Sequence, residues 1–169
     1  MTLRRGLATL GFALAVVSCR TTQGLKPVAS PDTSVACPAG RLVWNLEITD
    51  QRARREDSDR LLGLLRESLA KSFPGCQWAN PPRRDAPTIA IEVHRFSSDV
   101  DSGVWEAAAE WTVTVRDPAG STLTEFQADS RVSRPNYRGS NNEMESLRAA
   151  FEEAVSRTLT GLRNVSSRS

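Results

Sequence analysis

The chain has 169 residues, of which 39% are hydrophobic and 25% are charged. This length suits one domain with one hydrophobic core and is too short for two comfortable domains. The 22 basic and 20 acidic residues nearly cancel, so no bulk positive charge draws the protein to nucleic acid. We therefore expect no nucleic-acid partner.

The first eighteen residues have the layout of a secretory signal peptide. Arg4 and Arg5 precede an apolar run at 7–17 that is too short to span a bilayer as a helix. A small residue, Ser18, then stands before Cys19, and this arrangement resembles the lipobox of bacterial lipoproteins. The resemblance implies cleavage before Cys19 and acyl chains, including palmitate, on its thiol and new amino group. Two or more acyl chains anchor stably, since each buried methylene contributes about 0.8 kcal/mol.

The alternative interpretation is a plain signal peptide whose cleavage region happens to contain a cysteine. Arg20 follows Cys19, with no aspartate at that position. In lipoproteins of the common Gram-negative type this pattern favours sorting to the outer membrane, so we expect an envelope protein that faces the periplasm.

The two remaining cysteines, Cys37 and Cys76, form an even pair in a compartment that is expected to be oxidising. We predict a disulfide between them, with two separately buried thiols as the alternative.

The rest of the chain divides into a tether and one domain. Residues 19–40 are rich in Thr, Ser, Pro, Gly and Ala, which predicts a lipidated flexible tether. The domain is expected at 41–165, followed by a short tail at 166–169.

Hydrophobic periodicity predicts six elements in the domain. Alternating residues predict strands at 42–48, 89–94, 105–116 and 122–128, with a hairpin loop at 97–103 and a turn at 117–120. Apolar residues at helical spacing predict one helix after Asp57 or Ser58, ending at Pro74-Gly75. A second helix follows a capping-box pattern at Asn142 and Glu145 and should bury Met144, Leu147, Phe151, Val155 and Leu162.

This element order predicts an α+β fold: a two-layer sandwich in which a four-stranded mixed sheet has two amphipathic helices on one face. A helix that returns antiparallel to the first strand ends near that strand's start, which would bring Cys76 toward Cys37.

Groups that carry catalysis or bind metal are few. The single histidine, His94, lies mid-strand, with no nucleophile-elbow motif in the chain. No set of three or four metal ligands is evident. Glu92, Glu106 and Glu110 share a predicted sheet face, where a carboxylate pair could act as in glycosidases, although solvated glutamates are common there. We expect no catalytic residue, no metal and no cofactor.

Two arginine groups and one tryptophan are candidates for binding. Arg52, Arg54 and Arg55 lie in one loop and Arg83 and Arg84 in another, where guanidinium groups could engage lipid phosphates or an acidic partner. Solvated loop charge is the simpler alternative. Trp78 lies in an expected loop and could form part of a partner surface.

The pattern as a whole resembles the small Gram-negative auxiliary lipoproteins of ABC-type transport systems, the PqiC-like group. The residues that carry the likeness are Cys19 with its lipobox, the strand at 91–96 ending in Arg95-Phe96, the Ala/Trp strand at 107–115 and the closing helix at 147–162. The resemblance implies a non-enzymatic protein that docks on envelope transport assemblies and helps to move lipids. The Cys37/Cys76 pair departs from that group.

We therefore expect a lipid-anchored, non-catalytic accessory subunit of a transport or outer-membrane assembly. The alternatives are an orphan surface lipoprotein that binds a ligand or envelope partner without a transporter and, more remotely, a hydrolase.

Overall fold

The computed structural model describes residues 22, 24–29, 37–53, 55–138 and 140–166. Two α-helices, α1 (Ser58–Ser72) and α2 (Ser140–Ser166), accompany five strands: β1 (Val43–Asp50), β2 (Gln77–Trp78), β3 (Thr88–Asp101), β4 (Val104–Arg116) and β5 (Thr122–Pro135). Two short 3-10 helices are η1 (Pro38–Gly40) and η2 (Asn136–Arg138). The α+β class is as predicted.

The sheet is mixed and has the order β2-β1-β3-β4-β5. β1 runs parallel to both β2 and β3, while β3, β4 and β5 form an antiparallel meander. The prediction of four strands is wrong, because β2 adds a fifth. Gln77 N–H donates to Leu42 O at 2.7 Å and Ala79 N–H donates to Trp44 O at 2.8 Å, so this short strand is defined by its pairing with β1.

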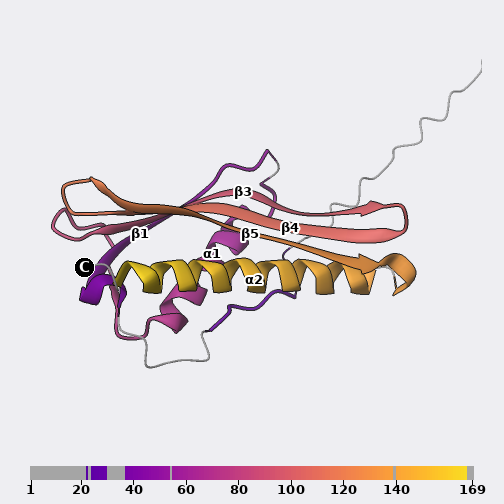
Figure 1. The fold of residues 1–169 in the computed structure, drawn as a ribbon, viewed down its shortest axis with the longest axis horizontal. Helices are drawn as coiled ribbons and strands as arrows, with labels where there is room; N and C mark the ends of the chain where they lie inside the picture. Colours follow the sequence, from indigo (N-terminus) through magenta and orange to yellow (C-terminus); the bar gives the residue numbers. More distant parts are fainter. Residues whose placement is uncertain (1–21, 23, 30–36, 54, 139, 167–169) are drawn as a thin grey trace, which may run out of the picture.

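The antiparallel strands are longer than their apolar patterns indicate. The predicted loop at 97–103 is instead mostly strand, and only Ser102 and Gly103 turn the chain, both with positive φ. β5 continues seven residues beyond the predicted end at Ala128. The β3–β4 hairpin and the end of β5 therefore form a long extension at one end of the molecule (Figure 1).

Both helices cover the same face of the sheet, and α2 lies along β4 and β5 (Figure 1). Alternate residues of β4, from Ala107 to Val115, are buried beneath them. Trp111 is fully buried, and its Nε1 donates to Thr158 Oγ1 of α2 at 2.8 Å. Its ring packs with Phe151, which also meets Phe96 edge to face. None of the described helices is long and apolar enough to cross a membrane.

The start of α2 differs from the expectation. The helix begins at Ser140, so Asn142 lies within its first turn and donates its side-chain amide to Pro135 O. The capping box is therefore wrong. Met144, predicted to be buried, is 41% exposed. The first turns of α2 lie under the β3–β4 hairpin, beyond the densely packed core.

The predicted disulfide between Cys37 and Cys76 is present, with their Cα atoms 5.4 Å apart. It joins η1 to the segment between α1 and β2. Part of the segment predicted as tether packs against the domain: Leu25 is buried, and Val28 N–H donates to Ser68 Oγ of α1 at 2.9 Å. Packing at 25–28 shortens the free length available between Cys19 and the domain.

Candidate functional site

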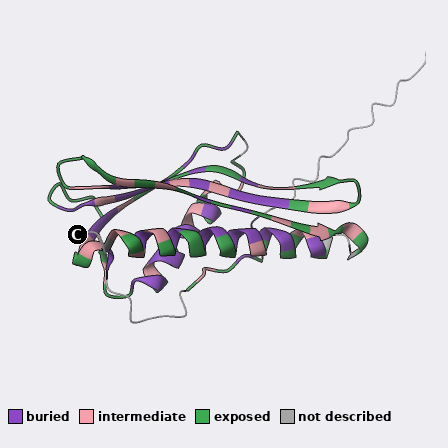
Figure 2. Ribbon diagram, viewed as in Figure 1, coloured by how far each residue is buried: buried purple, intermediate pink, exposed green. Residues whose placement is uncertain are grey.

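The face of the sheet opposite the helices is not covered by either helix (Figures 1 and 2). It is polar, because the residues that alternate with the core positions of β3, β4 and β5 are mostly charged or hydroxylated. They include Glu92, Glu110, Thr112, Thr114, Arg116, Glu125, Gln127, Asp129 and Arg131. We refer to this surface as the open face. Alternation of apolar and polar residues is typical of a sheet that packs one face on the core and exposes the other to solvent or to another molecule.

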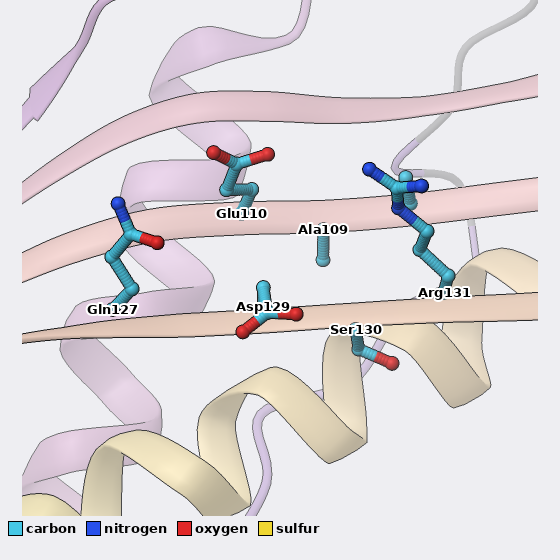
Figure 3. Close-up of a pocket in the computed structure, with 7 residues that line it drawn as sticks. Ala109, Glu110, Gln127, Asp129, Ser130 and Arg131 are labelled. Carbon is cyan, nitrogen blue, oxygen red and sulfur yellow. The ribbon is translucent and has the colours of Figure 1, made fainter.

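A shallow depression of about 170 Å³ lies on the open face between β4 and β5. Ala108 pairs with Arg131 across the two strands, and Glu110 pairs with Asp129. Figure 3 shows Glu110 and Arg131 projecting from neighbouring strands. The small side chain of Ala108 leaves the space that these longer side chains surround. The depression therefore offers both acidic and basic hydrogen-bonding groups.

The strand β5, which forms one side of the depression, is joined to α2 by ion pairs and hydrogen bonds. Ser130 Oγ donates to Glu153 at 2.8 Å, and Arg157 lies 2.8 Å from the same carboxylate and 3.5 Å from Asp129. Hydrogen bonds from Ser130 and then Arg157 lower the pKa of Glu153. These contacts fix the edge strand β5 to the helix beneath it.

The three glutamates singled out from the sequence do lie on the open face. Glu92 pairs with Thr112, Glu110 with Arg95, and Glu106 with Asp99. Glu106 and Glu110 are separated by four strand positions, which corresponds to about 13 Å at 3.3 Å per residue. Glycosidase carboxylates lie about 5–9.5 Å apart, so this pair does not have the spacing of a glycosidase dyad.

His94 lies at a register shift between Val93 and Arg95, and its Nε2 is 2.9 Å from Thr112 Oγ1. Among the described residues, no group of three or more His, Cys, Asp or Glu side chains could hold a metal ion.

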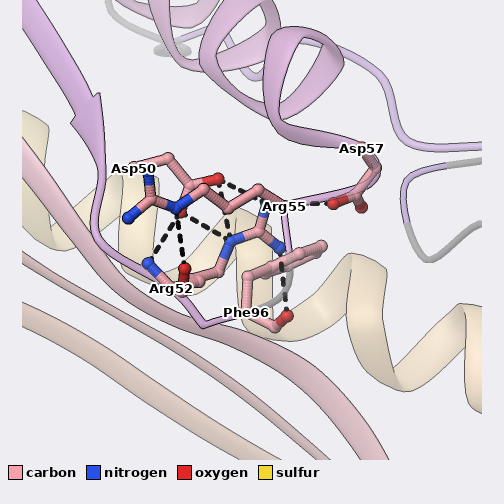
Figure 4. Close-up of polar contacts among 5 residues, drawn as sticks. All are labelled: Asp50, Arg52, Arg55, Asp57 and Phe96. Atoms are coloured by element: carbon pink, nitrogen blue, oxygen red, sulfur yellow. Dashed lines mark hydrogen bonds and ion pairs between the residues drawn. The ribbon is translucent and has the colours of Figure 1, made fainter.

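Arg52 is buried rather than available to a lipid headgroup. Its side chain is 7% exposed, and its guanidinium binds Asp50 at 2.8 Å and Asp57 at 2.9 Å (Figure 4). Nη1 also donates to the carbonyl of Phe96 on β3. The expectation that Arg52 belongs to an exposed binding loop is therefore corrected: a planar guanidinium here links β1, β3 and the start of α1.

This cluster alters the ionisation of its members. Burial alone would raise the pKa of Asp50, but hydrogen bonds from the side chain and backbone N–H of Arg52 outweigh burial and lower it. Burial likewise opposes the charge on Arg52, but hydrogen bonds to Asp50 and Asp57 raise its pKa. Both partners are held in their charged forms.

The remaining candidates do not form one patch. Arg55 is exposed, and its Nε donates to Arg52 O at 2.8 Å; Arg54 lies outside the described residues. Trp78 is half-buried beside Trp44 at the start of β1, and its Nε1 has no hydrogen-bond partner among the described residues. Arg55 follows the end of β1, so the length of that strand separates it from Trp78.

The second arginine group lies near the start of β1. Arg83 forms an exposed ion pair with Asp85 at 2.7 Å, and its backbone N–H donates to the Asn45 side chain of β1. Arg84 is also exposed. Arg83 and Arg84 therefore lie toward the start of β1, whereas Arg52 and Arg55 follow its end.

Sequence reasoning missed the structural role of Asp50 and Asp57, and it missed the depression. The sequence does contain one signal for the first: Asp50 and Arg52 are two residues apart at the end of a strand. Cys19, the predicted lipidation site, lies outside the described residues.

No protein-family model matches this chain, and no curated protein matches it. Solved structures do resemble it. A protein of the DUF330 family from Xanthomonas campestris is 18% identical, with a TM-score of 0.52, over 85% of this chain and 94% of that one. A lipoprotein from Caulobacter crescentus is 17% identical (TM-score 0.48, 72% and 92% covered), and a minor lipoprotein from Acinetobacter baumannii is 13% identical (0.46, 73% and 91%). The likeness to the Xanthomonas protein is one of fold.

Proposed function

We propose that this chain is a non-catalytic lipoprotein of the bacterial envelope, anchored through Cys19 to the outer membrane and facing the periplasm. The observation that carries the proposal is a lipobox-like sequence at Cys19 in a chain whose other two cysteines, Cys37 and Cys76, form a disulfide. Disulfides persist in oxidising compartments such as the periplasm. Arg20 after the modified cysteine supports the outer membrane as the destination.

The role that these features support best is binding, as an accessory subunit of an ABC-type lipid transport or outer-membrane assembly. The sequence resemblance to the PqiC-like group supports the transport system, and the open face supplies a polar surface next to a long edge strand. Arg54, Arg55 and Trp78 remain proposed contact residues at the two ends of β1. The large separation of Glu106 and Glu110 argues against these two residues as a glycosidase dyad.

The anchor is tested by intact mass and by incorporation of an alkyne-labelled palmitate in growing cells. We expect the mature chain to begin at Cys19, to carry acyl groups and to fractionate with outer membranes. Cys19→Ser is the matched variant and should lose the label and remain uncleaved. A mature wild-type chain without fatty acid would overturn the proposal.

The partner is tested by cross-linked pull-down from intact cells. We expect a permease and its ATPase to be enriched with the wild-type chain. Charge reversal at Glu110 and Arg131 should reduce their recovery, while Arg148→Glu, an exposed change on α2, should not. An orphan lipoprotein that binds a ligand or envelope partner without a transporter is the alternative, and recovery of the acylated chain without transport subunits would favour it.

A further inference from the structure

We propose that the end of the domain formed by the β3–β4 hairpin, η2 and the first turns of α2 rests on the lipid surface that anchors the chain. We call it the hairpin end. This inference rests on the proposed lipidation of Cys19 and adds the orientation of the domain on the membrane.

The elements of the hairpin end are held together by hydrogen bonds. Asn136 N–H at the start of η2 donates to Gly103 O in the hairpin turn at 2.8 Å. Ser98 Oγ of β3 donates to Glu143 of α2 at 2.7 Å. Arg134 of β5 lies 3.3 Å from Glu145. The hairpin, the end of β5 and the start of α2 therefore form one connected surface.

This surface carries three of the five exposed large hydrophobic residues that the described chain contains. They are Tyr137, Val100 and Met144, which are 75%, 45% and 41% exposed. Val100 pairs with Trp105, which is half-buried. Val100 and Trp105 lie two positions nearer the hairpin turn than Ser98 and its partner Ala107. They are therefore on the same face of the sheet as that pair, which is the face toward α2. Aromatic side chains favour the membrane interface, where one edge contacts acyl chains and the other contacts headgroups.

The first described residues of the chain lie at this same end. Gly24 lies directly against Met144, because a Cβ at that position would stand 2.9 Å from Sδ of Met144. From there the chain runs toward the other end, since Val28 binds Ser68 late in α1 and η1 lies near α2. Gly24, a described residue at the hairpin end, lies five positions after Cys19 in the sequence.

The chain length decides between the two ends. Cys19 and Gly24 are five positions apart, a separation of at most about 17 Å when the chain is fully extended. The helix from Met144 to the end of α2 covers about 33 Å at 1.5 Å per residue. The other two exposed hydrophobic residues lie at the opposite end: Leu42 directly precedes β1, and Leu123 is the second residue of β5. The point at which Cys19 enters the bilayer is thus closer to the hairpin end than to the end that carries Leu42 and Leu123.

Charge at the tip selects the kind of lipid surface. Asp99 and Asp101 are exposed beside Val100, and anionic headgroups would repel them. We therefore expect the contact to be made with a zwitterionic surface and to weaken as anionic lipid is added.

The test uses the mature acylated chain in phosphatidylcholine vesicles that contain a brominated lipid, which quenches nearby tryptophan. Tyr137→Trp adds a reporter at the hairpin end, and Leu123→Trp adds a matched exposed reporter at the opposite end. We expect the fluorescence added by Tyr137→Trp to be quenched and that added by Leu123→Trp to persist. Replacing part of the phosphatidylcholine by phosphatidylglycerol should reduce the quenching.

Co-flotation separates the two possible failures. A chain that floats with the vesicles but whose Tyr137→Trp reporter is quenched no more than Leu123→Trp refutes this orientation and leaves the anchor standing. A chain without acyl groups that does not float refutes the proposed lipidation and the orientation with it.

Discussion

Arg52 and Asp57 form an ion pair with 2.9 Å between Nη2 and Oδ1. It joins the residues that follow β1 to the residue that precedes α1. The same guanidinium binds Asp50 through Nε and Nη2. Asp57 is therefore engaged by Arg52, and its side chain makes no capping hydrogen bond to α1.

We expect Arg52→Met to destabilise the protein strongly. The substitution leaves the buried Asp50 carboxylate without its guanidinium, and breaking a buried pair from one side costs about 3–5 kcal/mol. The free energy of unfolding in urea measures this loss. Arg83→Met is the matched control, since Arg83 makes the same two-bond contact with Asp85 on the exposed surface; its urea midpoint should barely move. Equal effects of the two changes would contradict the assigned role of Arg52.

The Asp50 carboxyl also predicts a pH dependence. Its pKa is lower in the folded protein than in the unfolded chain, so it stabilises the fold at a pH above the unfolded value of about 3.9. This contribution is lost as the pH falls through the folded pKa. Unfolding free energies measured across roughly pH 2–5 should therefore rise less steeply with pH in Asp50→Asn than in the wild type. Parallel curves would show that another group controls the acid transition.

The disulfide should contribute to stability through the loop that it closes. Cys37 and Cys76 are 39 positions apart, and a loop of this length corresponds to about 4 kcal/mol in the chain-entropy model. Cys37→Ser should lower the melting temperature in non-reducing buffer. A reductant should lower the wild-type value toward that of the variant and leave the variant unchanged. A variant that melts with the oxidised wild type would argue against a stabilising bridge.

Periodicity identified the elements in which every core-facing position is apolar. In β4, every odd-numbered position from Ala107 to Val115 is apolar, the residues between them are polar except for Ala108, and the strand forms as predicted. α1 also forms as predicted, because its buried leucines recur at helical spacing, although Ser68 and Ser72 are buried among them. Such segments can be predicted because burial of one face requires a single period.

The elements that were missed depend on partners that a local pattern does not contain. In the second half of β5, a core-facing position is Ser130, which is buried but satisfied by Glu153 of α2. A polar residue there interrupts the apolar period, so the strand was predicted to end at Ala128. β2 has only two residues and exists because β1 lies beside it.

The candidate sites show the same limit. Arg52 and Arg55 are both arginines in the same charged segment after β1, yet Arg52 is buried and Arg55 is exposed. The difference arises from Asp50, Asp57 and the Phe96 carbonyl, which come together only in the fold. Loop arginines can therefore be found from the sequence, but their exposure cannot.

At Gly161, α2 lies close against the Phe126 side chain of β5. A Cβ added there would collide with the ring of Phe126. In an exposed helix, Gly→Ala stabilises by up to about 1 kcal/mol. Here we expect Gly161→Ala to destabilise by about 1–3 kcal/mol, because the ring must leave its packed position. Gly63→Ala in α1 is the control, since its added Cβ has no atom within 4 Å beyond its chain neighbours and the backbone of its own helix, and it should stabilise.

Shortening the opposing side chain tests the cause of that loss. In the Phe126→Leu background, Gly161→Ala should cost less than in the wild type, because leucine lacks the ring atoms with which the Cβ collides. Urea unfolding of the two single variants and the double variant gives this coupling directly. If the two single effects simply add, the close contact between α2 and β5 is not the source of the destabilisation.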